Sequence, residues 1–229
     1  MKFATRPYYY ASNNPKMQLI NAKDVKFEYF SGFARERKQK SIESMHKAIK
    51  KLYPQAKILE ISKASPNQLG QKLSAFNLKL KVFNGIQDIT ASVERFFQGS
   101  KVFNNGGPFE EIIFNENIHP KKYDKLKKGC NFQGFKLFGK CYSTEPVTFF
   151  YDWLYINALK QNSILATELE NYDIFTDIEF NPNKSLSCQA ATVALFLSLK
   201  KAGTLDKATK TSDEFLKLRL SVIDNQSLF

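Results

Sequence analysis

Residues 92–103 read Ser92-Val-Glu-Arg-Phe-Phe-Gln-Gly-Ser-Lys-Val-Phe103 and are the most informative part of the chain. Read as a helix, they place Glu94, Gln98 and Lys101 at positions i, i+4 and i+7, on one face. Apolar side chains occupy much of the remaining circumference, which is typical of a buried helix. A buried carboxylate or amine needs a partner or a chemical role. The stretch therefore predicts the wall of a polar pocket inside a core.

On both sides of this helix, the pattern of apolar residues predicts an α+β fold in which helix predominates over strand. Alternation predicts a few short strands, at residues 25–30, 57–62, 78–83 and 135–138. Helical spacing and capping signals predict helices, at residues 34–52, 65–69, 109–114, 149–159, 163–169, 190–200 and 214–222. We expect an irregular arm at residues 1–23, and residues 174–180 fit either a strand or a helix.

The composition indicates a packed, non-secreted protein. The 229 residues include 21 Phe and 10 Tyr, enough to build a large core, and no Gly/Ser- or Pro-rich linker divides them. We therefore expect a single domain over residues 1–229. The sequence has neither a membrane-spanning apolar run nor a signal peptide, which predicts a cytoplasmic location without membrane contact.

The few metal-binding side chains argue against a metal site. Cys130, Cys141 and Cys188 are an odd number without CxxC spacing, which also argues against disulfides. His46 and His119 have no partner apparent in the sequence, so we expect both at the surface. The sequence predicts neither a metal nor a cofactor.

The net charge of +12 suggests a polyanionic partner, with nucleic acid as the usual one. Lysine and arginine concentrate in three clusters, at residues 35–51, 121–128 and 200–210. The alternative is a basic surface that serves only solubility.

Residues 92–103 resemble the signature helix of the NADAR family, the YbiA-like N-glycosidases. The match runs through Val93, Glu94, Phe97, Gln98 and Lys101, and Arg95 replaces the usual His. Three further segments are similar to family elements in the expected order, namely Leu73–Asn77, Asp152-Trp153 and Thr176–Glu179. The family's next element, an Asp followed by Trp-Gly, is absent.

The chain is most similar to one branch of that family, the NADAR antitoxins encoded beside DarT-type DNA ADP-ribosyltransferase toxins. Residues 1–57 form an N-terminal extension that compact YbiA-like chains lack, and we expect it to pack on the core. The resemblance implies a NADAR fold, ADP-ribosylated DNA as substrate and a DarT-type toxin as functional partner. The implied reaction removes ADP-ribose from guanine and needs no metal or cofactor.

Breaking the N-glycosidic bond requires charge stabilisation at ribose C1″, a proton for guanine and an activated nucleophile. We expect Glu94 to supply the carboxylate beside C1″. An alternative route captures C1″ as a Schiff base on a buried lysine, with Lys101 as the first candidate and Lys40 as the second. Lys101 has a simpler alternative, an ion pair with a carboxylate or phosphate. Glu179 is the third catalytic candidate.

The remaining candidates for substrate contact each have a structural alternative. Gln98 either reads the guanine edge or satisfies a backbone group, and Asn77 either contacts ribose or caps a helix. Trp153 either stacks on a displaced guanine or anchors the core. The other candidates are Asp152, by its family match, and Phe76 and Phe97, which are core residues by default. Of Asp177 and Glu179, at most one should face the pocket, and the family pattern favours Glu179.

Two other functions remain open at this point. A YbiA-like N-glycosidase of small phosphorylated ribosylamines would not need the basic clusters. A non-catalytic antitoxin would use the same basic and aromatic surface to bind nucleic acid or the toxin itself.

Overall fold

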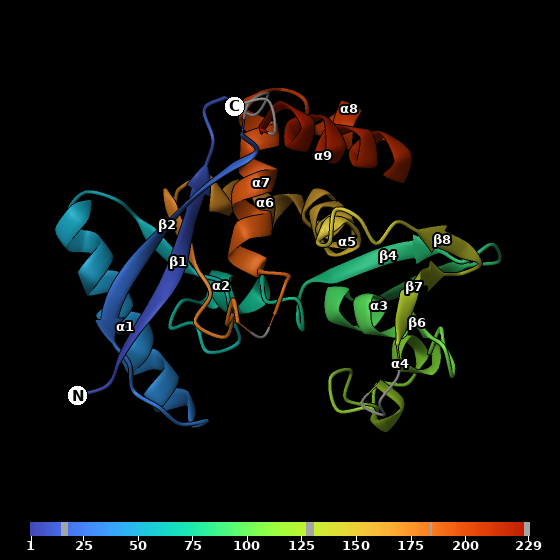
Figure 1. Ribbon diagram of the computed structural model, residues 1–229, viewed down its shortest axis with the longest axis horizontal. Helices are drawn as coiled ribbons and strands as arrows, with labels where there is room; N and C mark the ends of the chain where they lie inside the picture. Colours follow the sequence, from blue (N-terminus) through green and yellow to red (C-terminus); the bar gives the residue numbers. More distant parts are fainter. Residues whose placement is uncertain (15–17, 127–130, 184, 227–229) are drawn as a thin grey trace.

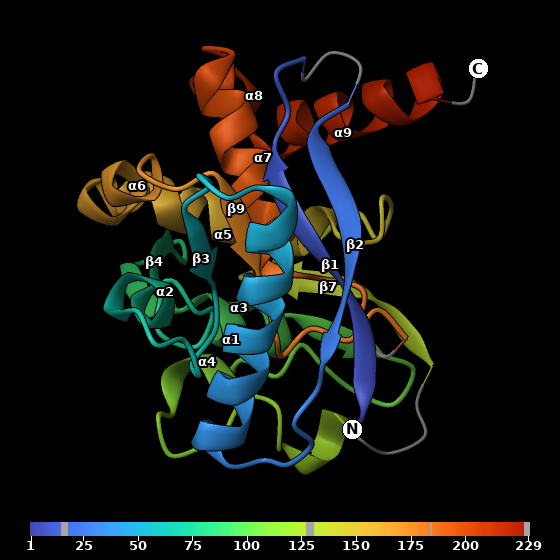
Figure 2. The same ribbon diagram turned by 90° about the vertical axis from the view of Figure 1, so that its left-hand side faces the viewer.

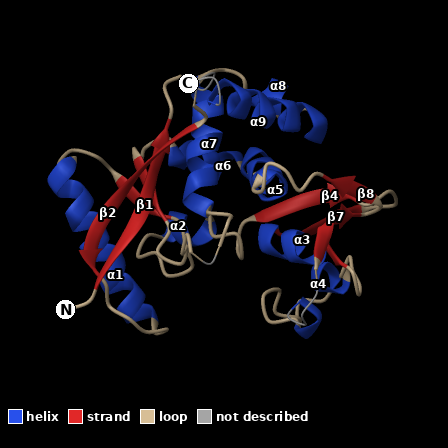
Figure 3. Cartoon of the chain, in the orientation of Figure 1, coloured by secondary structure: helices blue, strands red, loops and turns tan. Residues whose placement is uncertain are grey.

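The computed structural model describes residues 1–14, 18–126, 131–183 and 185–226, the last five of them without side chains. These residues form a mixed α/β protein with nine helices and three small sheets, in which helix exceeds strand (Figures 1 and 3). The predicted mixture of helices and short strands is therefore confirmed. Cys130, Lys127 and Lys128 lie outside the described residues, as does the side chain of Val222, the last residue of the helix predicted at 214–222.

The largest sheet combines three strands from the first 60 residues with one strand from far along the chain, at residues 174–176. Its order is β2 (Ile20–Glu28), β1 (Phe3–Ala11), β9 (Ile174–Thr176) and β3 (Ile58–Glu60). β1 pairs antiparallel with β2 and with β9, whereas β3 and β9 run parallel. β9 is thus a strand, which resolves the ambiguity at residues 174–180.

The expectation of an irregular arm at residues 1–23 was wrong, because residues 3–11 form β1. Tyr8 and Tyr9 are both buried but belong to different apolar clusters on opposite faces of the strand. β1 is stabilised by its partner strands and by helices on both faces. A strand of that kind depends on distant segments, which a local pattern does not reveal.

Helices cover both faces of this sheet (Figures 1 and 2). α1 (Arg35–Leu52) packs its buried residues Ile42, Met45 and Ile49 against the face that carries Tyr8. α7 (Gln189–Lys201) packs Val193 and its apolar neighbours against the face that carries Tyr9. The larger apolar cluster lies on this second side and continues into the rest of the molecule.

The rest of the molecule surrounds α3 (Val93–Gly99) with small hairpins and helices. β4 (Lys79–Phe83) pairs with β5 (Asp88–Ser92), a strand that the sequence did not predict, and β5 leads directly into α3. A three-stranded sheet follows, in the order β6 (Lys101–Phe103), β7 (Phe132–Leu137) and β8 (Lys140–Tyr142). The remaining helices are α2 (Gln68–Lys72), α4 (Glu111–Phe114), α5 (Phe149–Gln161), α6 (Ser163–Leu169), α8 (Leu205–Ala208), α9 (Ser212–Gln226) and a short 3₁₀ turn at Asp124–Leu126.

The predicted helix over residues 92–103 was too long. It ends at Gly99, and Lys101–Phe103 form β6, where Lys101 pairs with Phe135. Glycine is a poor helix residue, and the pairing with β7 satisfies the backbone groups that a longer helix would have used. Lys101 therefore does not share a helical face with Glu94.

His46, expected at the surface without a partner, is half-buried and does have one. It lies on α1 against the sheet, and its Nε2 is 2.9 Å from the hydroxyl of Thr176 on β9. Burial, followed by the charge of Lys50, lowers the pKa of His46 to about 4, so the ring is neutral at physiological pH.

Candidate functional site

A cavity of about 700 Å³ lies where the ends of β9 and α7 meet α3 and the paired strands β6 and β7. Its size falls in the range of small-molecule sites. Its lining mixes aromatic rings with carboxylates, amides and lysines: Phe76, Glu94, Phe97, Gln98, Lys101, Phe103, Lys121, Phe132, Gln133, Phe135, Thr144, Glu145, Val147, Tyr151, Asp177, Glu179, Phe180, Ser185, Leu186, Ser187 and Gln189.

Glu94 is the acidic residue that α3 contributes to this cavity. Its side chain is 4% exposed, and Gln98 donates an amide hydrogen bond to its Oε1 at 2.8 Å. The backbone N–H of Glu94 donates to the carbonyl of Ala75 at 2.9 Å, which fixes the start of α3 against the 73–77 segment. The Ser92 hydroxyl caps the helix by accepting from the N–H of Arg95. The Glu94 carboxylate is therefore held in one position.

Lys101 reaches the same cavity from β6. Its ammonium group lies 4.9 Å from the centre of the Phe97 ring, within cation–π range. Burial lowers the pKa of Lys101, and the charge of Lys121 acts in the same direction, whereas Glu94 opposes both. The strand thus places a lysine that deprotonates more easily than usual in the cavity that contains Glu94.

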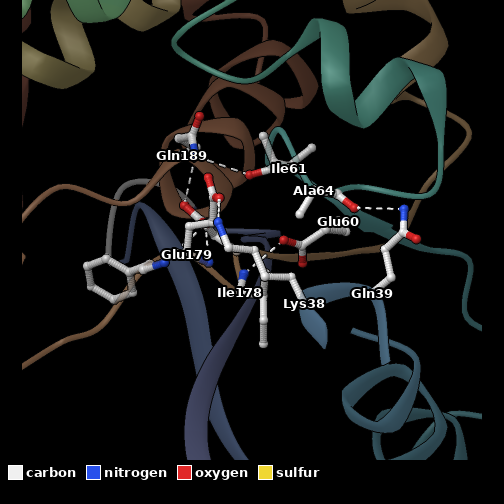
Figure 4. A network of polar contacts seen from close by, with 10 residues as sticks. Lys38, Gln39, Glu60, Ile61, Ala64, Ile178, Glu179 and Gln189 are labelled. Atoms are coloured by element: carbon white, nitrogen blue, oxygen red, sulfur yellow. Dashed lines mark hydrogen bonds and ion pairs between the residues drawn. The ribbon is translucent and has the colours of Figure 1, made fainter. Parts of the chain in front are cut away.

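Asp177 and Glu179 both line the cavity, although the sequence predicted that at most one would. They belong to a turn after β9, where the Asp177 carboxylate accepts from the backbone N–H groups of Glu179 and Phe180, each at 3.1 Å. Such a turn follows neither the strand nor the helical period, so alternation gave no guide to its side chains. Glu179 forms an ion pair with Lys38 of α1 (Figure 4).

Gln189, at the start of α7, connects three segments around the cavity. Its amide donates to Asp177 at 3.0 Å and to the carbonyl of Ile61 at 3.2 Å (Figure 4). Its carbonyl accepts from the backbone N–H of Ala75 at 2.6 Å. Burial raises the pKa of Asp177 to about 6. One amide thereby ties the ends of β3 and β9 to the segment that supports Glu94.

Aromatic rings form a continuous series along one side of the cavity. The ring of Phe97 lies 5.3 Å from Phe135, Phe135 lies 4.9 Å from Phe132, and Phe132 lies 5.9 Å from Phe103. Phe132 remains 43% exposed, so part of this apolar surface is open to a ligand. Aromatic surfaces of this kind are suited to stacking with a planar base.

The structure separates the predicted site residues into two groups. Seven line the cavity, namely Glu94, Lys101, Glu179, Phe76, Phe97, Gln98 and Asp177. Four do not. Asn77 is exposed and donates to the Gln71 carbonyl, and Lys40 lines a separate groove along α1 with His46 and other lysines.

The other two residues outside the cavity, Asp152 and Trp153, connect helices. Asp152 is buried and accepts hydrogen bonds from Thr148 at 2.7 Å and Thr192 at 2.5 Å. It also pairs with Arg219 of α9 at 3.3 Å. The Trp153 ring lies 5.8 Å from that of Phe215. Asp152 thus holds α5 to α7 and α9, and Trp153 packs α5 against α9.

Fourteen of the 21 cavity residues were missed as candidates from the sequence, among them Lys121, Tyr151 and Gln189. Lys121 appeared only as part of a basic cluster, and neither Tyr151 nor Gln189 was singled out. Tyr151 is 4% exposed, and burial raises its pKa far above the usual value. Because α5 is apolar on nearly every side, its pattern does not show which face meets the cavity. The position of Tyr151 beside Asp152 was the one available signal that it could be functional.

In the part of the chain that the structure describes, no group of three or more His, Cys, Asp or Glu side chains could hold a metal ion. Over the same residues, none of the helices combines the length and apolarity that crossing a bilayer requires.

A buried carboxylate in one cavity with a half-buried lysine and aromatic rings is typical of enzymes that use acid–base or nucleophilic chemistry. The sequence model of the family described as DarT1-associated NADAR antitoxin matches residues 4–227, so the chain belongs to this family. NADAR proteins are generally N-glycosidases or hydrolases, which supports an enzyme, and the family description associates the chain with a DarT1 toxin. A search of curated proteins found no match.

Proposed function

We propose that this protein is an N-glycosidase that removes ADP-ribose from guanine in DNA and thereby reverses the action of a DarT-type toxin. The main support is the position of Glu94, which is almost fully buried in the cavity with one carboxylate oxygen bonded to Gln98. Burying a carboxylate costs free energy because the group loses its water. A carboxylate kept in the cavity despite this cost fits a chemical role better than a structural one. Family membership supports the antitoxin role.

In the hydrolytic route, Glu94 lies beside ribose C1″ and stabilises the positive charge that develops as the bond to guanine weakens. The C1″–N bond breaks with its electron pair going to guanine, which takes up a proton. A water oxygen bonds to C1″ and loses a proton to Glu94. The products are free ADP-ribose and an unmodified guanine in DNA.

In the second route, Lys101 is the nucleophile. Its neutral amine bonds to C1″ as guanine leaves with the electron pair of the C1″–N bond and a proton. The resulting ribosylamine then opens by breaking its C1″–O4″ bond, which gives an imine between Lys101 and C1″ and a hydroxyl on C4″. Water hydrolyses the imine, which regenerates the lysine amine and releases ADP-ribose. The lowered pKa of Lys101 supports this route because more of the amine is neutral at pH 7. Borohydride reduction separates the two routes, since only the second attaches the ribose to Lys101.

The substrate guanine must leave a duplex stack to bring C1″ into the cavity. The aromatic series from Phe97 to Phe103 supplies stacking surface for it. The net charge of +12 supports contact with the DNA backbone, which should weaken steeply as salt rises.

The test uses a single-stranded oligonucleotide with one ADP-ribosylated guanine, incubated with wild type, Glu94→Gln and the exposed control Glu168→Gln. We expect the wild type and the control to release ADP-ribose. For Glu94→Gln we expect at least a ~100-fold loss in rate, because removing one electrostatic or acid–base contribution costs this much. Mass spectrometry follows the loss of the ADP-ribosyl group, and circular dichroism confirms that the variants are folded.

A folded Glu94→Gln variant with the wild-type rate would contradict the role of Glu94. If the wild type leaves the oligonucleotide unchanged but cleaves a phosphorylated ribosylamine, the protein acts on small molecules instead. If Glu94→Gln still protects cells from the toxin, protection comes from binding rather than catalysis.

A further inference from the structure

Two lysines from distant parts of the sequence meet over one aromatic ring of the cavity. Phe76 is half-buried and lines the cavity. The ammonium group of Lys63 lies 4.9 Å from the centre of its ring, and that of Lys121 lies 5.1 Å from it. Lys63 follows β3, whereas Lys121 belongs to the loop after α4. The fold has thus placed two positive charges against the same ring, and Lys121, unlike Lys63, also lines the cavity.

Carboxylates neutralise this charge only in part. Lys121 pairs with Glu94 at 3.6 Å, which is longer than a hydrogen bond, and its side chain remains 54% exposed. For Lys63, the described residues contain no ion pair. His119, whose ring lies 5.8 Å from that of Phe76, has its pKa lowered by burial and then by Lys122 and Lys63, which indicates a locally positive potential.

A rigid support holds Lys121 in this position. The guanidinium of Arg95 donates to four backbone carbonyls, one in α4 (Ile112) and three in the loop between α4 and Lys121 (Asn115, Glu116 and Ile118). Five fixed donors on a planar group make Arg suited to such multiple bonding. The loop is therefore tied to α3, the helix that carries Glu94, so Lys121 and Glu94 are positioned together.

We propose that Lys63 and Lys121 form a phosphate subsite, and that it binds the pyrophosphate of the ADP-ribosyl group. This inference rests on the proposed function. Glu94 would lie beside C1″, and the phosphate on C5″ of the same ribose is close to that atom. A DNA backbone phosphate, by contrast, is separated from C1″ by a whole nucleoside. The contact between Lys121 and Glu94 therefore fits the pyrophosphate and not the backbone.

The experiment measures binding and catalysis for wild type, Lys63→Ala, Lys121→Ala and the control Lys217→Ala, an exposed lysine of α9. Calorimetry gives the affinity for ADP-ribose and for inorganic pyrophosphate, and for the unmodified oligonucleotide in a separate titration. We expect each subsite variant to bind ADP-ribose at least about tenfold more weakly, as lost charge-assisted contacts do, with the control unchanged. In the glycosidase assay, Lys63→Ala should raise KM by a similar factor and leave kcat within about threefold.

Two results would overturn the subsite. ADP-ribose affinities of both variants within twofold of wild type would exclude a phosphate contact. An equal loss of affinity for the unmodified oligonucleotide would assign the lysines to the DNA backbone instead. Failure of the proposed function looks different: the wild type would then leave the modified oligonucleotide intact, whereas the ADP-ribose titrations would still test the subsite.

Discussion

At the scale of single residues, a series of hydrogen bonds through His46, Thr176 and Glu60 connects α1 to the strand that leads into the site. The Thr176 hydroxyl donates to Glu60 at 2.6 Å and lies 2.9 Å from Nε2 of His46. With Glu60 ionised, the hydroxyl hydrogen is used by its carboxylate, so the imidazole then donates from Nε2. Glu60 also accepts from the backbone N–H of Ile178 at 2.8 Å, so it holds the start of the turn that carries Asp177 and Glu179 (Figure 4).

Burial shifts the pKa values of Glu60 and His46, the two ionisable groups in this series of hydrogen bonds, in opposite directions. It raises that of Glu60 from 4.5 to about 7, with a further contribution from Asp177, and lowers that of His46 from 6.5 to about 4. Between pH 4.5 and 7 the folded protein holds a proton on Glu60 that the unfolded chain has lost, so this contribution to stability falls as pH rises. For His46 the unfolded chain binds the extra proton between pH 4 and 6.5, so its contribution falls as pH falls.

The His46 effect can be isolated with His46→Gln, which keeps an Nε2 donor for Thr176 but does not titrate. Relative to wild type, the variant should gain stability as pH falls from 6.5 to 4, by about 3 kcal/mol at the low end. Urea denaturation at several pH values measures this difference, and NMR titration of the wild-type imidazole measures its pKa directly. Parallel stability profiles for the two proteins would contradict the prediction.

At the scale of elements, α3 organises the site through both of its ends. Its first turn carries Glu94, and Arg95 beside it anchors residues 112–118. Its last residue, Gly99, packs so closely on Ile113 that an added Cβ would lie 2.6 Å from that side chain. The helix and the α4 loop therefore behave as one supported unit, on which the position of Lys121 depends.

This dependence predicts the effect of Arg95→Lys. A lysine offers a single ammonium group and cannot reach four carbonyls with fixed geometry, so several part-buried or exposed carbonyls lose this donor. We expect a loss of about 1–3 kcal/mol in unfolding free energy and a rise in KM through the displaced Lys121. Thermal denaturation and the glycosidase assay measure the two effects, with the exposed Arg35→Lys as control. If Arg95→Lys had the wild-type unfolding free energy and the wild-type KM, other contacts would hold the loop.

At the scale of the whole molecule, the first 57 residues supply most of one apolar cluster. Tyr8, Val25, Phe27 and the buried face of α1 pack with Ala64, Ile174 and Ile178, which come from the rest of the chain. β1 also contributes Tyr9 to the larger cluster under α7. These contacts support the proposal that residues 1–57 and the remainder fold as a single unit.

Deletion of residues 1–57 provides the test. Without β1 and α1, both β9 and the apolar surface around Ile174 become exposed, and an exposed strand edge beside apolar surface favours aggregation. We expect the truncated chain to be insoluble or to lose cooperative unfolding, as measured by size exclusion and by thermal circular dichroism. A soluble truncated chain with a cooperative transition would mean that the extension is a separate, dispensable module.

The local sequence was enough to predict the elements whose pattern repeats over several turns. The apolar spacing of residues 35–52 predicted α1, and the pattern after Pro146 predicted α5 and α6. The apolar flanks of Glu94 predicted that this acid is buried. These features depend on the periodicity of neighbouring residues along one helix, which the sequence records directly.

The tertiary structure alone determined the features that depend on distant partners. β1 forms because β2 and β9 pair with it, and α3 ends at Gly99 because β6 pairs with β7. Gln189 and Lys121 reach the cavity from positions 95 and 27 residues beyond Glu94 in the sequence, and no local pattern connects them to it. Asp152 and Trp153, which matched the family motif, lie instead between helices. The cavity results from contacts between remote segments, so the sequence supplied its central acid but not its full lining.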